Sequence, residues 1–332
     1  AGDTVRVKSL DSIMQTLDDR GTTDGVPFMP EMAEFCGRVF EVDKVAHKTC
    51  DTAYRTGGRW LDSTVHLADL RCNGSGHGGC DADCYLFWKD EWLEFEARSR
   101  DNDQRSDRSH GADLAALESH ARVEDNVYRC QATELFHFTR LARWWDPRQY
   151  LWDWLTGNEK ISALARFGTL KLFSNLTTLS FGYGLFVRLH GWARAVLGGI
   201  PHHGRSGGVK KGQRTPKQDL ALKAGDVVEV KSLDEIVDTL DQDYKNRGMR
   251  FDIEAVPFCG KRFRVSKRVE RILDEQTGEL YDLKTPSVIL DGVFCTARYS
   301  DMRMFCPRKI PSFWRDIWLK RVDEPNVIAR GG

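Results

Sequence analysis

Apolar and polar residues alternate in short runs through the first part of the chain, with one brief change to a helical period. Residues 4–7, 38–42 and 63–70 alternate and predict strands. Residues 11–17 carry apolar side chains at helical spacing behind a capping Ser or Asp, which predicts a helix of one or two turns. Clusters of Gly and Asp between these runs predict turns. Short strands with little helix are typical of a small β-barrel, and the pattern is compatible with an SH3-like one.

The same pattern occurs twice, because the opening segment returns near the end of the chain together with three of its cysteines. The matched positions are residues 1–18 and 224–241, Cys36 and Cys259, Cys72 and Cys295, Cys80 and Cys306, Trp88 and Trp314, and Trp92 and Trp318. We therefore predict a mixed, mainly β fold with two duplicated small SH3-like β-barrels and an inserted α-helical segment. The predicted units are a first barrel with a Cys-rich loop at 1–97, a helical segment with flexible linkers at 98–221, a second barrel at 222–322 and a tail at 323–332. The shared tryptophans are expected to close each core.

The middle segment changes to a helical period. Apolar residues from Leu135 to Trp145 recur at helical spacing, which predicts a helix that ends before Pro147. Further predictions for this segment are helices at 148–156 and 160–197 and linkers at 102–110 and 202–217.

The charge of the chain is balanced overall but uneven in the middle. The 49 Lys and Arg residues match 49 Asp and Glu residues, so no net charge identifies a partner. Residues 160–217, in contrast, contain ten basic residues and no acidic one. This segment is a candidate surface for a protein partner or an anionic membrane, whereas pairing with acidic residues of the barrels would leave it a plain solvated face. We do not expect a nucleic acid as the partner.

Composition narrows the class of protein. Hydrophobic residues make up 41% and charged residues 30%, which excludes a disordered chain and a simple coiled coil. The longest uncharged apolar span, 172–187, is shorter than the ~20 residues of a transmembrane helix. The nine cysteines are an odd number and the first residues lack a signal-like pattern, so we expect reduced thiols and a cytoplasmic location.

A glycine-rich loop carries the strongest candidate chemistry. Cys72, His77, Cys80 and Cys84 fall on this loop, and Cys50 precedes it in a separate turn. Thiolates on a flexible loop are typical ligands of a soft cation or an iron–sulfur cluster. We predict a metal site formed by these four cysteines and His77, with an iron–sulfur cluster slightly favoured over zinc.

Two other interpretations of these cysteines stay open. Free cysteines are often buried and pack as small apolar residues, and a redox disulfide is a further alternative. In the second repeat, Cys50 and Cys84 align with positions near Leu273 and Ile310. This asymmetry means either that the second repeat has lost a metal site or that core residues have drifted. His77 is either a ligand or a solvated loop residue.

Several longer motifs resemble those of a known group of proteins. They are VPFMPEM at 26–32, FCG at 35–37, KTCD at 48–51, RCNGSGHGGC at 71–80, FWKDEWL at 87–93, RCQATEL at 129–135 and WDPRQY at 145–150. The chain resembles an uncharacterised bacterial family in which two related barrel units flank a helical segment. The resemblance implies this architecture for nearly the whole chain.

The absent motifs limit the choice of function. The chain has no Walker A loop, no dinucleotide-binding glycine motif, no His-Glu-x-x-His and no Gly-x-Ser-x-Gly. We predict a cytoplasmic metal- or iron–sulfur-binding protein that acts as an enzyme or enzyme accessory in a biosynthetic pathway that modifies a small molecule or peptide. The alternative is a metal-stabilised scaffold that binds a protein partner or an anionic membrane surface through 160–217.

Overall fold

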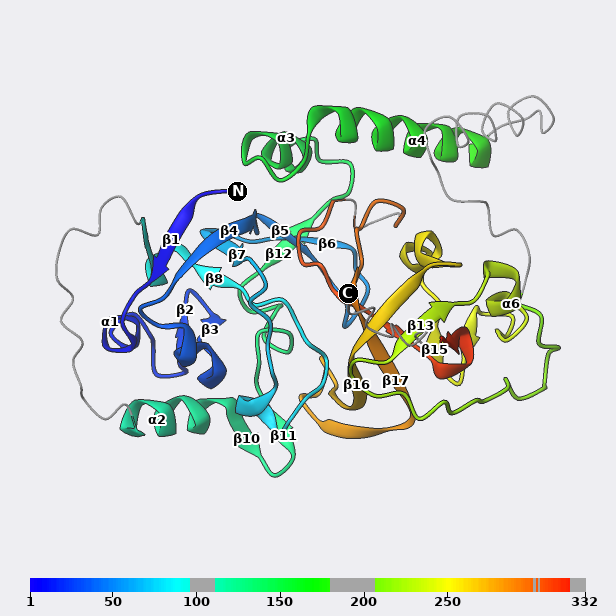
Figure 1. Ribbon diagram of the computed structural model, residues 1–332. Coiled ribbons are helices and arrows are strands. Elements are labelled where there is room, and N and C mark those ends of the chain that lie inside the picture. Colours follow the sequence, from blue (N-terminus) through cyan, green and yellow to red (C-terminus); the bar gives the residue numbers. More distant parts are fainter. Residues whose placement is uncertain (96–110, 180–206, 301–302, 304, 323–332) are drawn as a thin grey trace, which may run out of the picture. The chain divides into compact units, whose positions relative to one another are not determined.

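The computed structural model describes residues 1–95, 111–179, 207–300, 303 and 305–322 (Figure 1). The fold is mixed and mainly β, as predicted. By its internal contacts the chain divides into two compact units. Unit 1 comprises Ala1–Gly199, Arg271–Tyr281 and Thr296–Ile310, and unit 2 comprises Ile200–Glu270, Asp282–Cys295 and Pro311–Gly332. Two pieces of the second repeat therefore pack in unit 1.

The main sheet of unit 1 is antiparallel and has the strand order β8-β7-β4-β1-β9. Its strands are β1 (Thr4–Val7), β4 (Val39–Val45), β7 (Thr64–Leu67), β8 (Trp88–Lys89) and β9 (Leu93–Phe95). A single 3-10 turn, η3 (Asp90–Trp92), leads from β8 into β9. The three strands predicted from alternation in this unit are confirmed.

The main sheet of unit 2 has the equivalent order, β18-β17-β16-β13-β19. Its strands are β13 (Val227–Val230), β16 (Arg262–Leu273), β17 (Leu280–Phe294), β18 (Pro311–Trp314) and β19 (Leu319–Arg321), with η6 (Asp316–Trp318) before the last. The predicted closure into SH3-like barrels is not found: within the described ranges, the edge strands of each sheet do not pair with each other. In each repeat a 3-10 turn connects one edge strand of the sheet to the opposite edge strand.

The tryptophans shared by the repeats close both cores, as predicted. Trp88, Trp92, Trp314 and Trp318 are all completely or almost completely buried. Phe28 packs edge-on against Trp92 with ring centroids 5.1 Å apart, and Phe251 packs in the same way against Trp318 at 5.2 Å. Buried indole N–H groups need a partner. The Nε1–H of Trp92 donates to Thr23 Oγ1 at 3.0 Å, and that of Trp318 to Thr239 Oγ1 at 3.0 Å.

Shorter elements complete the two units. In unit 1 they are α1 (Leu10–Met14), β2 (Thr22–Thr23), β3 (Val26–Pro27), η1 (Pro30–Phe35), β5 (Lys48–Cys50), β6 (Gly58–Trp60), η2 (Ser75–His77), α2 (Gly111–Ala121), β10 (Arg122–Glu124), β11 (Val127–Tyr128), β12 (Arg140–Ala142), α3 (Arg148–Leu155) and α4 (Ile161–Leu179). In unit 2 they are α6 (Leu233–Val237), β14 (Lys245–Asn246), β15 (Met249–Arg250) and η5 (Ile253–Phe258). Within unit 1, α2 and α3 lie on opposite sides of the main sheet (Figure 1). Among the helices of the described ranges, none combines the length and hydropathy needed to cross a bilayer.

The helix predicted from Leu135 to Trp145 is wrong. This stretch begins with turns and continues as β12, which pairs antiparallel with β6 at the edge of a three-stranded sheet. The β6 backbone supplies the hydrogen-bond partners that a helix would have supplied internally. The helix predicted at 148–156 is confirmed as α3, and the start of the next helix is confirmed as α4. The predicted continuation beyond residue 179, the linker at 102–110 and the first part of the linker at 202–217 lie outside the described residues.

Candidate metal site

Glu31, Cys72 and His77 form a buried group whose donor atoms lie within 4.8 Å of one another. The Cys72 thiol donates to Glu31 Oε1 at 3.1 Å, and Cys72 Sγ lies 3.5 Å from His77 Nε2. His77 Nδ1 is 3.5 Å from Glu31 Oε1. All three residues are less than a tenth exposed. Carboxylate, thiolate and imidazole donors at this separation can hold a metal ion.

Glycines shape the loop that brings Cys72 and His77 together. The short turn η2 is bounded by Gly74 and Gly78, both in the left-handed region of φ. A Cβ on Gly74 would overlap the backbone of Cys80, and a Cβ on Gly76 would overlap Glu31 Oε2. The Cys72 N–H donates to the Cys84 carbonyl at 2.8 Å and closes the base of the loop. The loop therefore approaches Glu31 closely only because these positions lack side chains.

Three further thiols lie beside this group. Cys80, Cys84 and Cys130 line the same cavity as Glu31, Cys72 and His77, a cavity of about 40 Å³. Burial raises the pKa of the Cys84 thiol to about 12. Burial, and then the neighbouring Glu31 carboxylate, raise the pKa of the Cys72 thiol well above its ordinary value. Without a cation the thiols of Cys72 and Cys84 are therefore protonated at neutral pH, and a cation bound by them would release their protons.

Cys50 does not line this cavity. Its thiol is instead hydrogen-bonded to Cys306, and this partner together with burial raises the pKa of the Cys50 thiol. Arg308 contacts both groups of thiols. It lines the cavity beside Cys84, and its Nη1–H donates to the Cys50 carbonyl at 3.3 Å. Of the five residues predicted as ligands, the structure brings Cys72, His77, Cys80 and Cys84 together and places Cys50 in a separate thiol pair. All nine cysteines lie in the described ranges, and none forms a disulfide.

Glu31 and Cys130 were not predicted from the sequence as residues of this site. Glu31 comes from η1, far from the cysteine loop in the chain, and Cys130 follows β11. One signal was present, because the second repeat carries Glu254 at the matching position and both glutamates are buried. A carboxylate that is buried at the same place in two repeats has a structural or ligating role in at least one of them.

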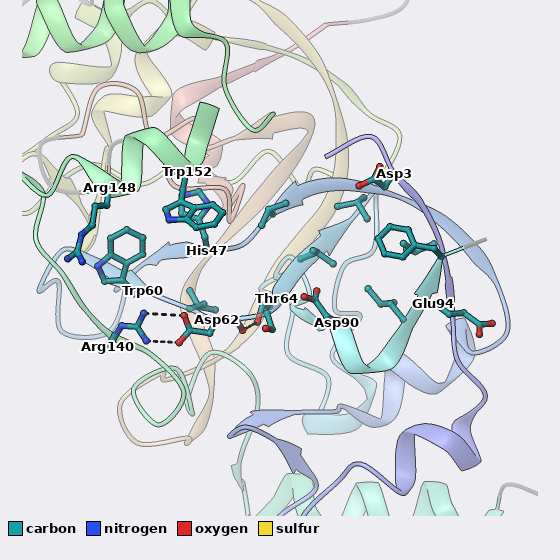
Figure 2. A pocket seen from close by; sticks show the side chains of 18 residues that line it. Asp3, His47, Trp60, Asp62, Thr64, Asp90, Glu94, Arg140, Arg148 and Trp152 are labelled. Atoms are coloured by element: carbon teal, nitrogen blue, oxygen red, sulfur yellow. Dashed lines mark hydrogen bonds and ion pairs between the residues drawn. The ribbon is translucent and has the colours of Figure 1, made fainter. Parts of the chain in front are cut away.

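A larger pocket of about 720 Å³ lies elsewhere in unit 1 (Figure 2). Trp60, Trp152 and His47 line one part of it. Arg140 makes a two-pronged ion pair with Asp62, with N–O distances of 2.5 and 3.1 Å. Other carboxylates in the wall are Asp3, Asp90 and Glu94. The pocket shares no residue with the metal-binding group, and its size suits a small organic ligand.

Comparisons with protein-family models, with curated proteins and with solved structures find no match to this chain.

Proposed function

We propose that the protein binds a zinc-type divalent cation through Glu31, Cys72 and His77, and that the ion stabilises unit 1. The observation that carries the proposal is the buried approach of these three donors to one another. Buried polar groups of this kind are costly unless they are paired or bind a metal. A cation would replace the weak thiol and imidazole contacts by metal–ligand bonds.

The donor types favour a zinc ion over an iron–sulfur cluster. Iron–sulfur clusters are bound mainly by cysteine thiolates, whereas zinc accepts sulfur, nitrogen and carboxylate oxygen together. The cavity of about 40 Å³ suits one ion better than a cluster. A fourth zinc ligand would come from the thiols that line this cavity, Cys80, Cys84 and Cys130.

The position of the site favours a structural ion over a catalytic one. A catalytic zinc keeps an open position for water or substrate, whereas a structural zinc is enclosed by protein ligands. The three donors are buried, and none of them borders the pocket of about 720 Å³. We therefore favour a metal-stabilised binding protein over an enzyme, with a small organic molecule or peptide as the ligand of the large pocket.

We also propose an SH3-like origin for the two sheets, and a family and a cellular location for the protein. An SH3-like origin of the two sheets is supported by the sequence repeat and by their equivalent strand order with a 3-10 turn before the last strand. Kinship with the bacterial two-unit family and a cytoplasmic location rest on the sequence motifs and on the cysteine usage.

Titration of metal-free protein with Co²⁺ tests the site, because cobalt substitutes for zinc and gives visible absorption when thiolates bind it. We expect one equivalent of Co²⁺ to produce a thiolate–cobalt spectrum that Zn²⁺ abolishes by displacement. Cys72→Ser and His77→Gln should weaken the spectrum strongly. Cys295→Ser is the matched control, because Cys295 occupies the position of Cys72 in the second repeat.

Two results would contradict the proposal. Equal spectra for the wild type and Cys72→Ser would place the ion elsewhere. Anaerobically purified protein that is brown and contains iron and sulfide would replace the zinc ion by a cluster, and Cys130→Ser would then lose it as well.

A further inference from the structure

Exposed apolar side chains are concentrated in one segment of unit 1. The described residues include 14 large apolar side chains that are exposed, and eight of them fall in the segment 141–161. The eight are Leu141, Trp144, Trp145, Leu151, Trp152, Trp154, Leu155 and Ile161. We call these eight residues the tryptophan surface. Exposed apolar groups scattered singly need no explanation, but several on one short helix mark an interaction site, and α3 carries four of the eight.

Helix α3 within this surface has its polar face inside and its apolar face outside. Gln149 and Asp153 are buried, whereas Leu151 and Leu155 are 51% and 59% exposed. At about 100° per residue, the two leucines point away from the two buried polar residues. Trp152 and Trp154 flank the leucines on either side of the helix and are also exposed. An ordinary surface helix has the opposite arrangement, so the outer face of α3 is built for an apolar environment.

Specific polar contacts hold the helix in this orientation. Asp153 Oδ2 accepts from Lys48 Nζ at 2.6 Å, and both side chains are buried. Gln149 Nε2 donates to the carbonyls of Arg143 at 2.8 Å and Trp144 at 3.2 Å. The outward position of the leucines is therefore fixed by the fold and does not depend on a mobile helix.

Within residues 141–170, which contain the tryptophan surface, the exposed charged side chains are all basic. Residues 141–170 contain three acidic side chains, and each is covered and engaged by a basic group: Asp146 by Arg148, Asp153 by Lys48, and Glu159 by Lys44 and Arg298. The basic residues of the same stretch, Arg143, Arg148, Lys160 and Arg166, are exposed. An anionic partner is therefore complementary to this face.

We propose that the tryptophan surface binds the surface of an anionic lipid bilayer. Leucines at the centre, tryptophans beside them and basic residues around them match an interfacial helix: the leucines enter the acyl boundary, the indoles lie at the headgroups, and the cations meet the phosphates. A protein partner would also cover apolar residues, but it would not require every carboxylate of the segment to be withdrawn. The site continues the basic segment predicted at 160–217, whose residues 180–206 lie outside the described ranges.

Co-sedimentation of the full chain with vesicles tests this inference. We expect binding to vesicles of equal phosphatidylglycerol and phosphatidylcholine at about 0.1 M salt, and much weaker binding to phosphatidylcholine alone. At about 1 M salt, where the Debye length is about 3 Å, binding to the anionic vesicles should fall steeply. The variant Leu151→Ser with Leu155→Ser should bind at least about tenfold more weakly, because two half-exposed leucines can no longer enter the lipid.

Two control variants separate lipid binding from unfolding and from general charge. Val39→Ser with Val123→Ser removes two exposed apolar residues of unit 1 outside the tryptophan surface and should leave binding unchanged. Arg143→Glu with Lys160→Glu should remove the preference for phosphatidylglycerol. Circular dichroism of each variant should match the wild type, because every substituted side chain is exposed.

Three results would overturn the inference: no sedimentation with either vesicle at low salt, binding of the leucine variant equal to that of the wild type, or equal affinity for neutral and anionic vesicles. A dimer in solution that the leucine variant abolishes, without vesicle binding, would likewise overturn it and assign the surface to a second copy of the chain.

Discussion

Replacing Asp153 by Ala should destabilise unit 1 strongly, because it leaves a buried ammonium group without its carboxylate. Lys48 Nζ lies 2.6 Å from Asp153 Oδ2, and His47 Nε2 lies 3.3 Å from Asp153 Oδ1. Asp153 has no exposed surface and Lys48 is 3% exposed. Burial lowers the pKa of Lys48, and the Asp153 carboxylate opposes this shift. The variant removes that opposing interaction and keeps the burial.

The expected loss is about 3–5 kcal/mol of unfolding free energy, the usual cost of breaking a buried ion pair on one side. The rings of Tyr150 and Phe305, centred 5.0 and 5.9 Å from Lys48 Nζ, face the ammonium group in both proteins, so the buried charge in the variant is not wholly uncompensated and the loss should lie at the lower end of this range. We therefore expect a net loss of about 3 kcal/mol. Asp62→Ala is the matched control, because its ion pair with Arg140 is more than half exposed and should contribute at most about 1 kcal/mol.

Urea unfolding followed by tryptophan fluorescence measures the effect, because Trp88 and Trp92 are buried in the same unit. The double variant Lys48→Met with Asp153→Leu removes both charges and should recover most of the stability. A loss below about 1 kcal/mol for Asp153→Ala, or a double variant as unstable as the single one, would refute the reasoning.

Three further predictions follow from the packing of unit 1. Burial lowers the pKa of His66 to about 3, so between about pH 6.5 and 3 only the unfolded chain binds this proton. The free energy of unfolding should therefore fall by about 2 kcal/mol from pH 8 to 5. Urea unfolding of His66→Gln should lack this part of the pH dependence. Gly74→Ala and Gly79→Ala both place a Cβ on a residue with φ of +79°, but only the Cβ at Gly74 would overlap a neighbouring backbone. Gly74→Ala should therefore lose about 1–3 kcal/mol more unfolding free energy than Gly79→Ala. Equal thermal stability of the two variants would contradict this description of the loop. Trp92→Ala should lose about 3–5 kcal/mol through cavity formation, and a loss below about 1 kcal/mol would contradict its role in the core.

Much of the local structure could be predicted from the sequence. Alternation at 4–7 and a capping Ser or Asp before a short helix depend only on neighbouring residues. The strand is found as β1, and the helix is found as α1 (Leu10–Met14), shorter than the predicted 11–17 and capped by Ser9, which accepts from the Ser12 N–H. The repeat also predicted the burial of Trp92 and Trp318, because a large indole kept in both copies needs a core.

Long-range features could not be predicted in the same way. The period from Leu135 to Trp145 fits a helix, but pairing with β6 overrides it, and local spacing does not show that pairing. The same limit explains why the cysteine loop was recognised while Glu31 was not. Its position in η1 has no motif of its own, and only the fold brings it to Cys72.

The positions of the buried cysteines depend on the tertiary fold, and their local sequence does not determine them. Cys50 and Cys130 are both buried cysteines outside the loop, and only the former was predicted as a ligand. The structure places Cys130 at the cavity beside the metal-binding group and Cys50 against Cys306. The distance of Cys50 and Cys130 from the loop along the sequence does not show which of them lies beside it, because tertiary packing determines the position of each.

Metal analysis of the full chain, purified without chelators and measured by elemental mass spectrometry, tests the central claim most directly. We expect about one zinc ion per chain in the wild type and in Cys295→Ser, and almost none in Cys72→Ser. Wild-type protein without bound metal, or Cys72→Ser protein with the full zinc content, would contradict it.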